Sequence, residues 1–234
     1  MTTHPFLDLQ AIDSALDAIG HRRVRLPEAA AVQRDAAALG EVQRAIAAAT
    51  ARIEAALVAI GVAERESQEL TTQRTRMETQ LKTVISPREA EALMSQIATL
   101  NAQRGECDDR ELAALDEQAV GEAERELQQQ LVPDLEAALE VSNEALAAAL
   151  AALDAEAADL SGRRATVIAG FPPDQLATYD HVRKQFGGVG VAHLEGSHCS
   201  GCHMDLSPAE LDQVKSVPAG ELGECPQCGR ILVR

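Results

Sequence analysis

The sequence predicts a mainly α-helical protein, in which a long antiparallel coiled-coil hairpin is followed by a small C-terminal β zinc ribbon. Three observations predict it: apolar residues recur in sevens over two long segments, a proline-containing turn separates them, and four of the five cysteines form two C-x-x-C pairs near the C-terminus. The composition agrees, because 234 residues with no tryptophan, one tyrosine and three phenylalanines lack the large side chains that fill a big globular core.

A short amphipathic helix is predicted at residues 6–20. Gly20 is expected to end it, and Pro27 suits the first turn of the next helix. The apolar stripe of the short helix consists of Leu9, Ile12, Leu16 and Ile19.

A heptad pattern from about residue 28 to residue 84 predicts a coiled coil. One seam position holds Leu39, Ile46, Ile53, Ile60, Ser67, Arg74 and Leu81, and the other holds Val42, Ala49, Ala56, Ala63, Leu70, Met77 and Val84. Because many of these side chains are alanine, we expect close helix approach over a thin core that stabilises less per heptad than a leucine core would.

The sequence near residues 84–88 predicts the turn of the hairpin. Ser86 can cap a new helix, and Pro87 fits its first position. This second helix should run to about residue 166, with Pro133 kinking or briefly breaking it. Its leucines recur in sevens at Leu139, Leu146, Leu153 and Leu160.

Three domains are expected along the chain. Residues 1–168 form the hairpin, residues 169–188 a connecting segment with a short helix, and residues 189–234 the zinc ribbon. Short helices at about 173–186 and 208–216 and a strand at 189–194 are predicted within the last two domains. The connecting segment holds three of the four aromatic residues, which are candidates for docking a partner: Phe171, Tyr179 and Phe186.

The two cysteine pairs predict one structural Zn²⁺ ion. Each C-x-x-C turn presents two thiolates at the spacing of two tetrahedral corners, and two such turns close a four-sulfur site without an open position for water. Gly201 and Gly229 are expected to permit turns whose backbone N–H groups face the sulfur atoms. The predicted ligands are Cys199, Cys202, Cys225 and Cys228.

Other chemistries for the cysteines stay open at this point. A disulfide is disfavoured in a reducing compartment, and a thioredoxin-like redox pair needs a βαβ setting that these cysteines lack. An iron centre would use the same four-sulfur geometry. His198 and His203 flank the first pair, but four cysteines suffice, so both are expected to be surface residues.

The formal net charge of −16 is the wrong sign for a protein that coats nucleic acid or an anionic membrane through its net field. The ribbon itself is net acidic and has no aromatic stacking platform. Basic residues gather towards the open end of the hairpin, where they could contact phosphate or a partner, or pair with the acid-rich helices. They are Arg22, Arg23, Arg25, Arg163, Arg164, Arg183 and Lys184.

Catalysis and membrane insertion are not expected. No glycine-rich phosphate loop, Ser-His-Asp set or carboxylate pair in a cleft can be named. The longest uninterrupted apolar run, residues 145–153, is about half of a membrane span, and the first residues include acids where a secretory signal is apolar. We therefore expect a cytoplasmic, non-enzymatic protein, and the excess of arginine over lysine and of alanine suggests a bacterial source.

The region from Tyr179 to Leu211, together with "CPQCGRILVR", resembles the bacterial C4-type zinc-ribbon proteins that carry an N-terminal coiled-coil hairpin. "SPREAEALMSQIATL" at 86–100 and "LP" at 26–27 are similar to segments of that family, so the resemblance covers nearly the whole chain. It implies a non-enzymatic adaptor. The family is generally described as nucleic-acid-binding, and some members are linked to transcription machinery, including an alternative sigma factor, and to flagellar gene control.

Two functional hypotheses follow. The first is a zinc-ribbon adaptor that binds a protein partner in transcription or gene regulation. The second is an RNA- or DNA-binding protein that uses the basic residues at the open end of the hairpin. A homodimer is also compatible with the sequence, because an alanine-rich seam can pair between chains as well as within one.

Overall fold

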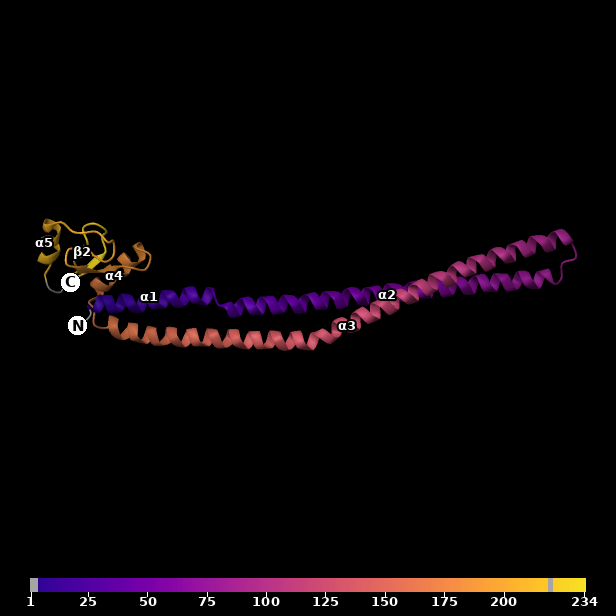
Figure 1. Cartoon of the computed structure of the whole chain (residues 1–234), viewed down its shortest axis with the longest axis horizontal. Coiled ribbons are helices and arrows are strands. Elements are labelled where there is room, and N and C mark those ends of the chain that lie inside the picture. The colour runs from indigo at the N-terminus through magenta and orange to yellow at the C-terminus, as the bar shows by residue number, and fades with distance from the viewer. Residues whose placement is uncertain (1–3, 219–220) are drawn as a thin grey trace. The chain divides into compact units, whose positions relative to one another are not determined.

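A computed structural model describes residues 4–218 and 221–234. The chain is mainly helical with a small C-terminal sheet, which confirms the predicted fold class (Figure 1). Its elements are α1 (Pro5–Val24), α2 (Pro27–Leu81), α3 (Pro87–Ile168), α4 (Pro173–Gln185), β1 (Val191–Glu195), β2 (His198–Cys199), α5 (Pro208–Ser216) and β3 (Ile231–Val233). They form two compact units: the hairpin unit, residues 31–142, and the ribbon unit, residues 4–30 with 143–234.

Proline opens each of these five helices, as the geometry of the first helical turn favours. One expectation about breaks was wrong. Gly20 does not end α1, which continues to Val24 with His21, Arg22 and Arg23 in its last turn, where positive charge complements the helix dipole. Pro133 was expected to kink α3 or to break it briefly; the helix continues through this exposed position, so the break is absent and the kink stays a prediction.

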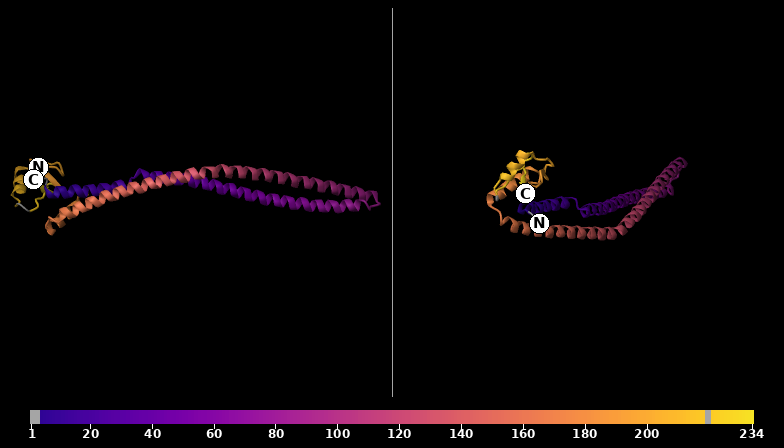
Figure 2. Two further views of the ribbon diagram at one scale, coloured as in Figure 1. Left: turned by 90° about the horizontal axis from the view of Figure 1, so that it is seen from below. Right: turned by 60° about the vertical axis from the view of Figure 1, so that its left-hand side comes forward.

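In the hairpin unit, α2 and α3 run antiparallel on either side of the loop at residues 82–86 (Figures 1 and 2). The ion pairs show the direction, because Arg52 of α2 meets Glu117 and Glu124 of α3 at 2.7 and 3.1 Å, whereas Glu66, further along α2, meets Arg110. Small residues dominate the buried seam: Ala49, Ile53, Ala56, Ala63, Leu100, Cys107 and Ala114.

At Gly121 the two helices of this seam lie close together. A Cβ atom added there would lie 2.9 Å from Cγ1 of Ile53 and 3.3 Å from the carbonyl oxygen of Ala49. The thin core expected from the alanine pattern is therefore present, and it also depends on Gly121, which lies seven residues after Ala114 on the α3 side of the seam.

One helical stretch within Pro5–Leu81 is long and apolar enough, by length and composition, to cross a bilayer; its mean hydropathy is 1.7. A search for uninterrupted apolar runs does not find this stretch, because the charged residues Arg52 and Glu54 divide it. Arg52 forms ion pairs with two glutamates of α3. This part of α2 therefore pairs with an acidic helix, as the coiled-coil pattern predicts.

The sheet of the ribbon unit has the order β2-β1-β3. Strand β1 pairs antiparallel with β2, placing Leu194 opposite Cys199, and parallel with β3, placing Val191 opposite Ile231. Side chains alternate between its faces. One face packs Val191, Ile231 and Val233 against α1 and α4, where Phe6, Leu9, Tyr179 and Val182 are buried. The other face packs Ala192, Leu194 and Leu232 against Cys199, Leu206, Val214 and Cys225.

Candidate metal centre

The sulfur atoms of Cys199, Cys202, Cys225 and Cys228 all lie within 4.8 Å of one another. Those of Cys202 and Cys225 are 3.9 Å apart. A tetrahedral zinc–thiolate site with bonds of about 2.3 Å places its sulfur atoms about 3.8 Å apart, so the four side chains fit one Zn²⁺ ion. Cys199 and Cys225 are 0% and 1% exposed, which suits a closed structural site. The zinc prediction is thereby supported by the geometry.

The two cysteine turns have the same backbone construction. The N–H of His203 donates to the carbonyl of Cys199, and that of Gly229 donates to the carbonyl of Cys225, at 2.9 and 2.8 Å. Both donors lie four residues after the first cysteine and have positive φ, 60° for His203 and 74° for Gly229. Gly229 therefore has the conformational role expected of it, whereas in the first turn that role falls to His203 rather than Gly201.

Gly201 is required for space. A Cβ atom there would lie 2.8 Å from Cβ of Ala192 and 2.9 Å from Cδ of Arg230. We expect Gly201→Ala to destabilise the zinc-loaded ribbon by about 1–3 kcal/mol, the usual cost of overpacking. Chelator competition should show weaker zinc retention. The control is Gly162→Ala, where α3 offers open space and the change should be neutral or slightly stabilising; equal behaviour of the two variants would contradict the steric argument.

Backbone donors surround the thiols and compensate part of the cost of burying charge. Burial raises the pKa of the Cys225 thiol to about 12, although N–H groups of Gln227 and Cys228 act in the opposite direction. Burial also acts to raise the pKa of Cys228, but hydrogen bonds with Arg230, Cys225 and Cys202 together outweigh it and lower that pKa. A bound Zn²⁺ supplies the positive charge that keeps all four ligands as thiolates.

Arg230 links the metal centre to the helical part of the ribbon unit. Its guanidinium lies 4.6 Å from the ring centroid of Phe186, the residue that caps α4. Its Nε donates to the carbonyl of Val189 at 2.9 Å. One side chain therefore touches the second cysteine turn, the start of the sheet and the end of α4.

The basic residues at the open end of the hairpin are mostly engaged within the ribbon unit. Arg22 pairs with Glu156 at 2.9 Å, and Arg23 pairs with Asp154 at 2.8 Å. Arg164 and Arg183 belong to the cluster described next. Three of the predicted cations, Arg25, Arg163 and Lys184, have no ion pair among the described residues.

Asp13 of α1 forms the centre of a buried polar cluster and is 3% exposed. Its carboxylate accepts hydrogen bonds from Arg164 Nε at 2.6 Å and from the Tyr179 hydroxyl at 2.8 Å. Arg183 donates to the Asp13 carbonyl at 3.3 Å and also pairs with Asp17. Burial, followed by the hydrogen bond to Asp13, raises the pKa of Tyr179 far above its usual range, so its hydroxyl remains a donor. The cluster joins α1, α3 and α4.

The aromatic residues of the connecting segment have different environments. Tyr179 is fully buried, so in this structure it is a core residue whose ring offers no surface to a partner. Phe171 packs against Phe6 with ring centroids 4.2 Å apart and is half-buried, as is Phe186.

The sequence did not predict Asp13 as a functional or structural residue. Its position one turn after Leu9, on the apolar stripe of α1, was nevertheless a signal of burial.

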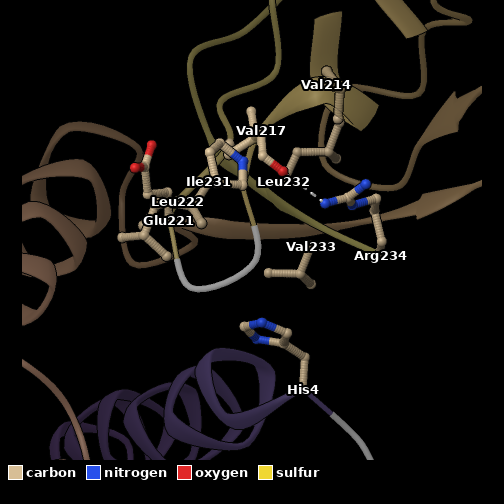
Figure 3. A pocket seen from close by; sticks show the side chains of 11 residues that line it. His4, Val214, Val217, Glu221, Leu222, Ile231, Leu232, Val233 and Arg234 are labelled. Atoms are coloured by element: carbon tan, nitrogen blue, oxygen red, sulfur yellow. Dashed lines mark hydrogen bonds between the residues drawn. The ribbon is translucent and has the colours of Figure 1, made fainter. Parts of the chain in front are cut away.

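A pocket of about 190 Å³ lies beside β3 and α5 (Figure 3). The guanidinium of Arg234 donates to the carbonyls of Lys215 and Val217 at 2.9 and 3.2 Å, so it fastens the chain end to the segment after α5. His4 and Glu221 are the other charged or titratable lining residues. Among the described residues, the lining side chains include no hydroxyl, thiol or amine.

The helical hairpin and the four-cysteine site define the chain as a coiled-coil hairpin protein with a C4-type zinc ribbon. The CT398-like coiled coil hairpin domain matches residues 9–187, and the C4-type zinc ribbon domain matches residues 198–232. The chain therefore belongs to the CT398-like coiled-coil hairpin family, and its cofactor is one structural zinc ion. Neither matched domain is a catalytic one.

The similarity to other proteins covers the whole chain or nearly all of it. The uncharacterized protein Rv2229c of Mycobacterium tuberculosis is 27% identical over 97% of this chain and 93% of its own length. A solved structure from Mycobacterium smegmatis has a TM-score of 0.78 at 22% identity and covers all of both chains. CT398 from Chlamydia trachomatis has a TM-score of 0.79 at 21% identity and covers 97% of this chain and 95% of its own. These structures show that the fold is shared.

Proposed function

We propose that this protein is a cytoplasmic, non-enzymatic adaptor whose zinc ribbon binds a protein partner in transcription or gene regulation. The two matched domains support a binding role, since a closed four-thiolate zinc site stabilises structure and leaves no position for substrate. The thiolates also need a reducing compartment to persist as ligands, which supports a cytoplasmic location.

We favour a protein partner over nucleic acid because most of the basic residues already form ion pairs with acidic residues of the ribbon unit. Phosphate binding needs cations that are free to replace counterions. Arg22, Arg23, Arg164 and Arg183 instead neutralise acids of the same unit, in a chain whose net charge is already −16. The unpaired Arg25, Arg163 and Lys184 favour nucleic-acid binding as the alternative.

The zinc ribbon also offers a surface for a partner. Met204 directly follows the first cysteine turn and is 54% exposed, and Val189 before β1 is 41% exposed. The backbone of a metal-bound turn, such as the one before Met204, is ordered before a partner binds, which reduces the entropy lost on binding.

Affinity capture from nuclease-treated lysate tests the proposal. We expect zinc-loaded wild-type protein to retain a protein partner, and Met204→Asp to lose it while keeping its zinc. The triple variant Arg25→Ala, Arg163→Ala, Lys184→Ala should retain the partner. The proposal fails if only nucleic acid is bound before nuclease treatment and the triple variant abolishes that binding.

A further inference from the structure

The outer face of α3 in the hairpin unit carries exposed apolar side chains. Outward positions of a coiled coil are normally polar. Here Leu112 and Leu127 are 62% and 60% exposed, and Val120 is 45% exposed. They lie away from the seam, to which α3 contributes residues at intervals of seven, namely Leu100, Cys107 and Ala114.

Three aspartates flank these apolar side chains along one strip of the helix. At 100° per residue, the strip occupies an arc of about 80°. We call it the acidic stripe, and it consists of Asp109, Leu112, Asp116, Val120, Ala123, Leu127, Gln130 and Asp134, all exposed. No lysine or arginine between Asp109 and Asp134 falls in this arc, and its three carboxylates have no ion pair within the described residues.

We infer that the acidic stripe docks a basic amphipathic helix of a protein partner. Apolar side chains of that helix would contact Leu112, Val120 and Leu127, while its lysines and arginines would reach the three aspartates. From Asp109 to Asp134 the stripe is about 37 Å long, which accommodates about seven turns of a partner helix. This inference rests on the proposed adaptor function and states the chemistry of its partner.

Charge argues against the other occupants of an exposed helical face. In a two-fold contact between copies of this chain, each stripe would meet an identical one, and carboxylates would face carboxylates. Nucleic acid and anionic lipid carry the same sign as the stripe. A partner segment that combines cations with apolar residues complements both the aspartates and the apolar side chains of the acidic stripe.

The binding test uses the full-length zinc-loaded protein and a fluorescein-labelled synthetic peptide. In this peptide leucines recur at i, i+3, i+4 and i+7, and lysines flank them. A second peptide has the same composition in scrambled order. Anisotropy at physiological salt should show that the amphipathic peptide binds, and that the scrambled peptide binds at least about tenfold more weakly, because it cannot present both components on one face.

Two charge-matched variants locate the site. Asp109→Asn, Asp116→Asn, Asp134→Asn together should weaken binding about tenfold, because each exposed charge contact contributes modestly. Glu41→Gln, Glu54→Gln, Glu64→Gln changes three exposed acids of α2 that have no ion pair among the described residues. This control should weaken binding less than about twofold. Circular dichroism should show unchanged helicity in both.

Four results would overturn the inference. Equal weakening by both triple variants would indicate attraction to the net charge alone, and equal binding of both peptides would remove the apolar component. A wild-type dimer in sedimentation that Leu127→Asp converts to a monomer would assign the stripe to a second copy. If the aspartate variant still captures the partner that Met204→Asp loses, the stripe inference fails while the adaptor proposal stands.

Discussion

Replacing Cys225 with serine should unfold the zinc ribbon together with the helices packed on its sheet, while the hairpin unit remains helical. Residues 189–234 have too small a core to fold without metal, and structural zinc supplies about 10–16 kcal/mol in small zinc-binding modules. Strands β1 and β3 contribute to two cores, one around the cysteines and one against α1 and α4. Loss of the metal therefore exposes Phe6 and Leu9 as well.

Hydrogen exchange measured by mass spectrometry checks this expectation. In Cys225→Ser, protection should fall in β1, β3, α5, α1 and α4, and persist in the seam of α2 and α3. Far-ultraviolet circular dichroism should keep most of its helical signal, because α2 and α3 comprise 55 and 82 residues, against 20, 13 and 9 in α1, α4 and α5. Metal analysis should find one zinc per wild-type chain and a loss of zinc in the variant, and it also separates zinc from iron.

Cys107→Ser provides the matched control. It is the same substitution at a buried cysteine of the hairpin seam, outside the group of four sulfur atoms. We expect it to retain one zinc and full protection of β1. A Cys225→Ser protein that keeps its zinc and a protected β1 would contradict the four-thiolate assignment. Loss of protection throughout α2 and α3 would contradict the independence of the hairpin unit.

The features that the sequence predicted well depend on neighbours along the chain. Heptads correctly predict that Ile53 of α2 and Leu153 of α3 are buried, and a serine–proline pair at 86–87 begins α3. The capping box of Ser207 and Glu210 begins α5, which spans the expected residues 208–216. Such signals act over one or two helical turns or within one cysteine turn, and sequence displays them directly.

The features that it did not predict depend on segments far apart in the chain. Gly121 and Gly201 look like ordinary glycines until Ile53 and Ala192 are found against them. Gln10 of α1 binds the backbone of Val191, the first residue of β1. Its side chain donates to the Val191 carbonyl at 2.9 Å and accepts from the Val191 N–H at 2.5 Å. No local sequence pattern indicates a contact between residues as far apart in the chain as Gln10 and Val191. The sequence therefore did not predict in detail how the zinc ribbon attaches to α1.

Asp13→Ala should strongly destabilise the ribbon unit. It leaves Arg164 and the Tyr179 hydroxyl without their shared acceptor in a buried site. Removing one partner of a buried ion pair costs about 3–5 kcal/mol, because the remaining charge stays desolvated. Arg164 is 28% exposed, which allows partial rehydration, so we expect a value near the lower limit.

The chain contains its own probe for this measurement, because Tyr179 is the single tyrosine and there is no tryptophan. Tyrosine fluorescence during urea unfolding therefore reports on the Asp13 cluster alone, and its midpoint should shift strongly in Asp13→Ala. Asp180→Asn is the control, since Asp180 contacts the same arginine at 3.5 Å from an exposed position. Its cost should be below about 1 kcal/mol. Similar midpoints for the two variants would mean that burial of Asp13 adds nothing to the pair, and that the junction of α1, α3 and α4 depends on its apolar contacts instead.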